Sequence, residues 1–144
     1  MAGEIVIGYD GTECGHAALD LACDLAKGLG ATLVPTYGYQ PYQGAGEIGT
    51  QRELMRDEGQ RLLDEAVATA AEHGVEAEAA LVPQRPAAAL ASVAEERGAR
   101  MIVVGTYGET PLKGAILGST PHKLVHMATV PVVVTPVAGS DAAD

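Results

Sequence analysis

The 144-residue sequence has no tryptophan and no phenylalanine, and aromatic residues make up only 3% of it. Its core therefore has to be aliphatic, and 47% of the residues are hydrophobic. Cations are scarce as well: nine lysines and arginines stand against 19 aspartates and glutamates, giving a formal net charge of -10. A nucleic-acid-binding protein needs a basic face, so this balance argues against a nucleic-acid partner.

Cysteine and long apolar runs are also scarce. Cys14 and Cys23 fall nine residues apart in one predicted helix, which puts them on opposite faces and beyond disulfide reach. Free thiols are consistent with a reducing compartment. The opening MAGEIVIGYD has no basic, signal-like segment, and no apolar run is long enough to cross a bilayer. We therefore expect a cytoplasmic protein without a membrane partner.

Strand and helix patterns alternate along the chain. The predicted strands are residues 4–10, 31–39, 75–82, 100–105 and 130–136. The predicted helices end near residues 29, 73, 97 and 128. This order favours a parallel sheet with helices on both faces.

Length and composition also predict the domain organisation. A chain of 144 residues is expected to form one domain, here residues 1–137, with residues 138–144 as a flexible tail.

Pro35 lies inside the second predicted strand and has no N–H for the ladder, so we predict an edge position or a bulge there.

A group of four glycines lies in VVGTYGETPLKGAILGSTPHK, residues 103–123, directly after an apolar run. Gly105 ends the fourth strand, and Gly118 precedes Ser119 and Thr120 at the start of a helix. The unpaired N–H groups and positive dipole end of that first turn suit a phosphate. The same residues also fit an ordinary capped helix start, and local chemistry leaves both interpretations open.

The spacing Gly-x2-Gly-x9-Gly-Ser, through Gly105, Gly108, Gly118 and Ser119, resembles the nucleotide-binding pattern of the universal stress protein family. The segments IVIGYDGT, MIVVG and HKLVHMATVPVVVTP resemble that family too, and the likeness covers essentially the whole chain. The resemblance implies a doubly wound five-stranded α/β sheet in the order 3-2-1-4-5, of the adenine nucleotide alpha hydrolase-like type. It also implies ATP with Mg2+ or Mn2+, and frequent homodimers.

Carried over by position, the resemblance assigns the phosphates and ribose to Gly105, Gly108, Gly118, Ser119 and Thr120. It places Gly8, Tyr9 and Asp10 beside the adenosine, and Asp10 could also serve the ribose or a bound metal. Gly38 would contact adenine through main-chain atoms.

The loop departs from the family pattern in its charge. Tyr107, which we include among the nucleotide contacts, and Glu109 stand where family members often carry arginines. Lys113 is then the one cation left in the loop and a possible phosphate contact. We therefore expect ATP binding that is weak or strongly metal-dependent.

The last strand suggests a dimer. PVVVTP is bracketed by prolines, which suits the edge of a sheet. Pairing with the same strand of a second copy would cover Val130, Val132, Val133 and Val134, and two-fold pairing is the commonest oligomer symmetry.

Catalytic patterns are absent from the sequence: it has no Ser/His/Asp order, paired-carboxylate spacing or Walker-type GKS. His16 lies near the expected crevice without an evident catalytic partner, and His122 and His126 form an i,i+4 pair without an evident third metal ligand. Exposed or interface histidines are the favoured interpretation of that pair.

We predict a nucleotide-responsive regulatory protein. A nucleotide-free interaction module, a slow ATP hydrolase and a cyclic or diphosphate ligand stay open as alternatives.

Overall fold

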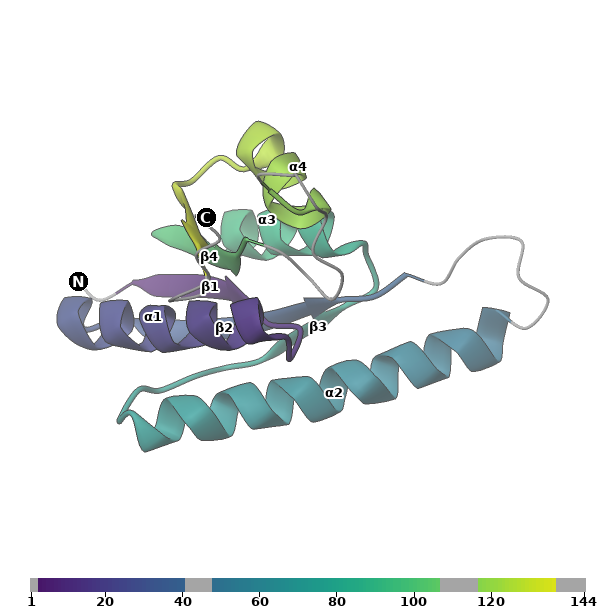
Figure 1. The fold of residues 1–144 in the computed structure, drawn as a ribbon, viewed down its shortest axis with the longest axis horizontal. Coiled ribbons are helices and arrows are strands. Elements are labelled where there is room, and N and C mark those ends of the chain that lie inside the picture. Colours follow the sequence, from purple (N-terminus) through teal and green to yellow (C-terminus); the bar gives the residue numbers. More distant parts are fainter. Residues whose placement is uncertain (1–2, 41–47, 107–116, 137–144) are drawn as a thin grey trace, which may run out of the picture.

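A computed structural model describes residues 3–40, 48–106 and 117–136 of the chain, so the predicted tail at 138–144 lies outside the described residues. Strands and helices alternate as the sequence predicts (Figure 1). They are β1 (Glu4–Gly8), α1 (Glu13–Leu29), β2 (Thr32–Gly38), α2 (Ile48–Glu72), β3 (Ala80–Val82), α3 (Pro86–Arg97), β4 (Met101–Gly105), α4 (Ser119–Met127) and β5 (Val132–Thr135).

The five strands form one parallel sheet in the order β3-β2-β1-β4-β5. This confirms the predicted doubly wound topology. Helices α1 and α2 pack on one face, and α3 and α4 pack on the other (Figure 1). The winding direction reverses between β1 and β4, so their carboxyl ends form the crevice where such sheets bind ligands.

The core is divided by the sheet into two aliphatic layers. Ile5 and Ile7 of β1 face α1 and α2, while Val6 between them faces α3 and α4. The buried hydrophobic residues of the described segments are aliphatic except for two tyrosines and the two cysteines, and both cysteines are free thiols. Among these segments, none of the helices has the length and apolar character of a membrane span.

Pro35 lies in an internal strand, so the predicted edge position is wrong. Leu33 pairs with Ala77 and Thr36 pairs with Ala80, so the register is unchanged across Pro35 and no bulge intervenes. The main-chain groups of Leu33 bond toward β3, and strand alternation directs those of Pro35 to the same side. The regular β2–β3 ladder begins just after Pro35, so the missing N–H is accommodated by a break in the ladder.

The first turn after β1 explains why that strand is shorter than predicted. Asp10 Oδ1 accepts hydrogen bonds from the N–H of Thr12 at 3.1 Å and from its hydroxyl at 2.6 Å. The Thr12 hydroxyl oxygen in turn accepts from the N–H of Gly15 at 3.1 Å, so Thr12 is the N-cap of α1. Asp10 and Thr12 thus belong to the turn that leads into α1, and β1 ends at Gly8.

Candidate functional site

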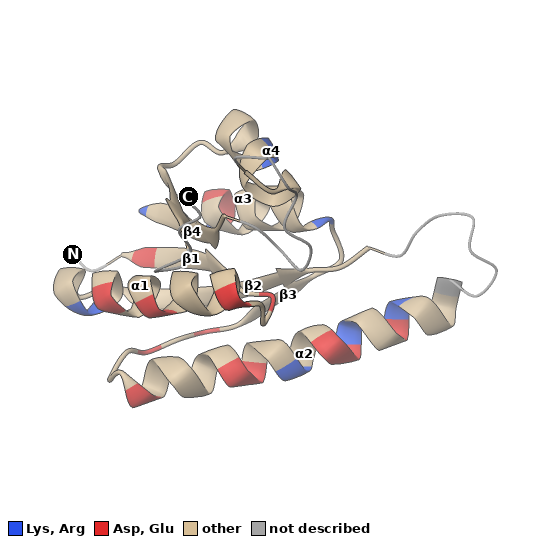
Figure 2. Cartoon of the chain, viewed as in Figure 1, with Lys and Arg blue, Asp and Glu red and all other residues tan. Residues whose placement is uncertain are grey.

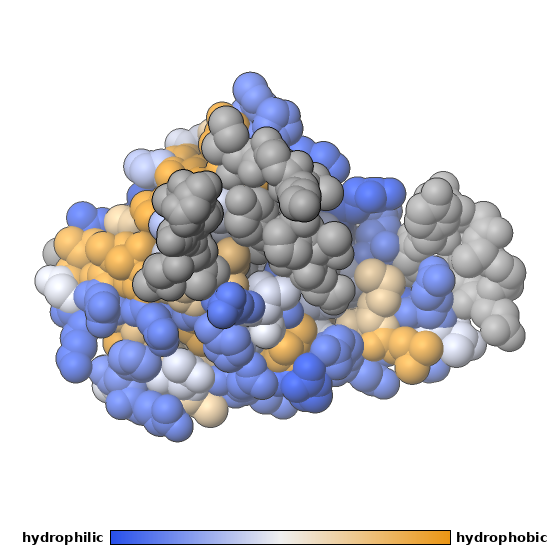
Figure 3. Space-filling model, in the orientation of Figure 1, coloured by the Kyte–Doolittle hydropathy of each residue, from blue (hydrophilic) through white to orange (hydrophobic). Residues whose placement is uncertain are grey.

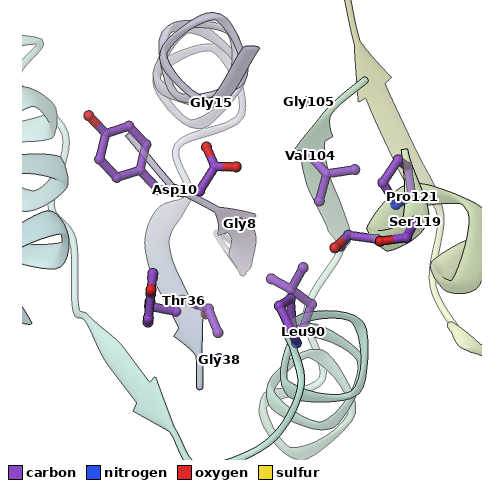
Figure 4. Close-up of a pocket in the computed structure, with 14 residues that line it drawn as sticks. Gly8, Asp10, Gly15, Thr36, Gly38, Leu90, Val104, Gly105, Ser119 and Pro121 are labelled. Carbon is purple, nitrogen blue, oxygen red and sulfur yellow. The ribbon is translucent and has the colours of Figure 1, made fainter. Parts of the chain in front are cut away.

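A cavity of about 320 Å³ opens where the carboxyl ends of β1, β2 and β4 meet the amino termini of three helices (Figure 4). Its size falls at the lower end of the roughly 300–1,000 Å³ common for small-molecule sites. The residues that line it are Gly8, Tyr9, Asp10, Gly15, Thr36, Tyr37, Gly38, Pro86, Leu90, Val104, Gly105, Ser119, Thr120 and Pro121.

The strand ends present main chain to this cavity because helices pack closely behind them. A Cβ at Gly105 would lie 2.7 Å from the Cβ of Cys14 on α1, and one at Gly8 would lie 3.0 Å from the Leu90 side chain on α3. A Cβ at Gly38 would lie 2.7 Å from that of Ala89. The three glycines thus serve helix packing, and the same lack of side chains keeps the cavity open.

Asp10 provides the anionic group of the site. Its Oδ1 is held by Thr12, as described above, and Gly15 makes room for the carboxylate because a Cβ there would collide with it. Asp10 is exposed, and no described residue hydrogen-bonds to its second oxygen. Figure 4 shows Asp10 on the β1 side of the cavity, with Ser119 on the α4 side.

The amino terminus of α4 supplies the hydrogen-bond donors. Gly118 is the N-cap, but its own N–H donates to the Thr106 carbonyl at 2.7 Å, and Gly118 does not line the cavity. The N–H groups of Ser119 and Thr120 have no acceptor among the described residues, and Pro121 has no N–H. Two amides and two hydroxyls are therefore available to an anion.

Tyr9 lines the cavity, but its hydroxyl is already engaged by the helices. The hydroxyl donates to Glu65 on α2 and lies 3.3 Å from the His16 ring nitrogens on α1. The rings of Tyr9 and His16 meet edge to face with centroids 5.4 Å apart. Burial, followed by the bond to Glu65, raises the pKa of Tyr9 well above its usual range. Tyr9 is thus a neutral anchor between β1 and both helices.

The structure brings together seven of the residues that the sequence assigns to a nucleotide site: Gly8, Tyr9, Asp10, Gly38, Gly105, Ser119 and Thr120. Gly118 lies just outside the cavity, and Tyr107, Gly108 and Lys113 fall outside the described residues. The role of all these residues toward a nucleotide stays a prediction.

Sequence reasoning missed the cavity wall formed by Thr36, Pro86 and Leu90. Thr36 is buried, and its hydroxyl donates to the Val34 carbonyl at 3.0 Å. Pro86 opens α3 directly after β3, so a strand-to-helix junction was the available signal. No group of three or more potential metal-ligating side chains occurs in the described part of the chain.

Similarity to known proteins agrees with this architecture. The profile of the universal stress protein family matches residues 1–136. The chain belongs to the universal stress protein family. Universal stress protein YxiE of Bacillus subtilis is 34% identical over 93% of this chain and 99% of its own.

Solved universal stress proteins share the fold as well. A crystal structure of a family member from Burkholderia pseudomallei is 30% identical, with a TM-score of 0.76 over 94% of this chain and 96% of that one. A universal stress protein solved in complex with cAMP is 26% identical, with a TM-score of 0.74 over 95% of this chain and 98% of that one.

Proposed function

We propose that this universal stress protein binds an adenine nucleotide in the cavity between β1, β4 and α4 as a sensing ligand. The observation that carries the proposal is the cavity itself, which is open at the strand ends and bounded by the amides of Ser119 and Thr120, for which the described residues offer no acceptor. The cAMP complex of a family member supports the choice of an adenine nucleotide.

The lining suggests how the nucleotide lies. Leu90 and Val104 offer apolar surface to a base or sugar, and Gly8 and Gly38 offer main-chain groups. Ser119 and Thr120 offer N–H and hydroxyl donors to the phosphate end, with the positive end of the α4 dipole behind them. The free oxygen of Asp10 is then available to a ribose hydroxyl or a metal-bound water.

We propose ATP with Mg2+ or Mn2+ as the ligand. The described lining residues include no lysine or arginine, and Asp10 adds a negative charge. A divalent ion would neutralise part of the phosphate charge that this lining leaves uncompensated. Removing the metal with a chelator should weaken ATP binding at least tenfold in calorimetric titration. Equally tight binding without metal would contradict the metal requirement.

We propose a regulatory homodimer in the cytoplasm, with the β5 edge as the interface.

Two alternatives to a nucleotide-sensing function make different predictions. An interaction module without a ligand would show no rise in melting temperature with nucleotide. A slow ATP hydrolase would release phosphate, and Asp10→Asn would abolish that release.

The decisive experiment is mass spectrometry of the small molecules that the purified protein releases on denaturation. We expect an adenine nucleotide in the released fraction, or, where the site empties during purification, a rise in melting temperature on adding ATP and Mg2+. A protein that releases no nucleotide and whose melting temperature is unchanged by ATP, ADP, AMP and cAMP would overturn the proposal.

A further inference from the structure

Two histidines lie side by side on an exposed face of α4. His122 and His126 are one helical turn apart, and both are exposed. Their ring centroids are 5.5 Å apart, with an interplanar angle of 75°. Two imidazoles at this spacing can direct one nitrogen each at the same ion, as the two histidines of helical His-x-x-x-His zinc sites do.

The other two histidines of the chain are already engaged. Nδ1 of His73 lies 2.9 Å from the Thr69 carbonyl, and the ring of His16 contacts the Tyr9 hydroxyl. In the described segments, the ring nitrogens of His122 and His126 form no hydrogen bond or ion pair with another side chain. The pair on α4 is therefore free to take up a ligand.

The net charge of the protein and the dipole of α4 both favour a cation near the pair. The protein carries a net charge of -10, which raises the local concentration of metal ions. His126 lies in the last turn of α4, where the negative end of the helix dipole stabilises positive charge. Lys123 is the one lysine, arginine, aspartate or glutamate in the α4 sequence, and Figure 2 shows no acidic residue on this helix.

We propose that His122 and His126 chelate a borderline divalent transition metal, with Zn2+ as the best fit. Imidazole nitrogen suits Zn2+, Ni2+ and Cu2+, whereas Mg2+ and Ca2+ prefer oxygen ligands. The two histidines supply half of a tetrahedral set, and water completes it. Neither histidine lines the cavity, so this site is separate from any metal that accompanies a nucleotide.

The test is calorimetric titration of nucleotide-free, untagged protein with Zn2+. We expect saturable binding by the wild type and at least tenfold weaker binding by His122→Ala and by His126→Ala. His73→Ala, which removes the histidine directly after α2, is the matched control and should bind like the wild type. Alanine is a strong helix former and both positions are exposed, so unchanged circular dichroism should accompany the loss.

A second readout separates this site from other metal-binding groups. Zn2+ should raise the melting temperature of the wild type and of His73→Ala, but not that of the double variant His122→Ala/His126→Ala. Zn2+ binding that survives in the double variant, or a wild type that binds no Zn2+, would overturn the inference. Neither result bears on the nucleotide proposal, because no nucleotide is present.

Discussion

Gly105, at the end of β4, has no room for a side chain. A Cβ there would lie 2.7 Å from the Cβ of Cys14 and 2.8 Å from the Cys14 carbonyl oxygen, which belongs to the α1 backbone. Because backbone cannot move aside as a flexible side chain can, Gly105→Ala should lower the free energy of unfolding by about 1–3 kcal/mol in urea denaturation.

The matched control for Gly105→Ala is Gly28→Ala in α1. A Cβ at Gly28 meets no atom within 4 Å, and alanine favours helix over glycine by up to about 1 kcal/mol. Gly28→Ala should therefore be neutral or stabilising. Equal destabilisation by the two substitutions would contradict the packing argument.

Cys23 makes stability sensitive to alkaline pH. Burial first, and then the charges of Asp20 and Asp24, raise the pKa of the Cys23 thiol from 9.0 to about 11. The thiol ionises more readily in the unfolded chain than in the folded one. The stability that comes from keeping the thiol neutral is therefore fully present below about pH 9, and the free energy of unfolding falls as pH rises toward 11. Cys23→Ala should remove this decline in urea titrations under reducing conditions, whereas Cys14→Ala should keep it.

An unchanged pH profile in Cys23→Ala would show that another group causes the alkaline decline. Tyr9 is the next candidate, because its pKa is raised above its usual value of 10.0. Its ionisation acts in the same direction, but at a higher pH than that of Cys23. Tyr9→Phe separates the two contributions.

At the residue scale, short-range chemistry was predictable and long-range contacts were not. The Thr12 cap is local, because it lies within four consecutive residues. The bond from Tyr9 to Glu65 joins residues 56 positions apart, so predicting it requires knowing which face of α2 opposes β1. The hydrogen bond from the Gly118 N–H to the Thr106 carbonyl likewise joins residues that are not neighbours in the sequence.

At the scale of elements, one arginine ties the carboxyl end of α3 to the amino-terminal ends of β1 and β3. Arg97 in the last turn of α3 lies 3.0 Å from Glu4 of β1 and 2.6 Å from Glu78 before β3, and the bond to Glu78 raises the pKa of its guanidinium. Arg97→Ala should cost about 1 kcal/mol in urea denaturation, with a smaller effect at high salt.

Arg61 on α2 provides the comparison for Arg97. It also contacts two carboxylates, Glu58 at 2.7 Å and Glu65 at 3.7 Å, but the arginine side chain is 60% exposed compared with 29% for Arg97. Solvent screens such pairs, so Arg61→Ala should leave stability nearly unchanged. Arg97→Ala behaving in the same way would contradict a stabilising role for the network.

The order of elements was predictable because hydrophobic periodicity and glycine or proline signals are local. The position of β2 was harder to predict because Pro35 alone indicates an edge. What the sequence does not state is that β3 begins only at Ala80, so that its regular ladder starts beyond Pro35. The convergence of Gly8, Asp10 and Gly105 was predictable, since it follows from parallel strands at a switch point.

At the scale of the whole molecule, the proposed dimer can be tested at the edge of the sheet formed by β5. Leu21 and Leu25 of α1 and Val133 of β5 are partly buried against one core cluster, and Figure 3 shows apolar side chains gathered over α1 and the strands beside it. The carbonyls of Pro131 and Thr135 accept from β4, so alternation directs the N–H of Val134 to the open edge.

Val134→Pro should therefore disrupt the dimer and leave the β4–β5 pairing intact. Proline removes only the outward N–H at this position and is tolerated on edge strands. Sedimentation equilibrium should show a wild-type dimer and a monomeric variant with a similar circular dichroism spectrum. A wild type that is already monomeric at micromolar concentration would contradict the proposed interface.

The most direct test of the nucleotide site is a calorimetric titration of Ser119→Asp with ATP and Mg2+, beside Thr129→Asp. Both positions are exposed, and an aspartate at the amino terminus of α4 favours the helix while it repels a phosphate. We predict that Thr129→Asp binds like the wild type and that Ser119→Asp binds at least tenfold more weakly. Equal binding by the two variants would contradict the assignment of the phosphate to the α4 amino terminus.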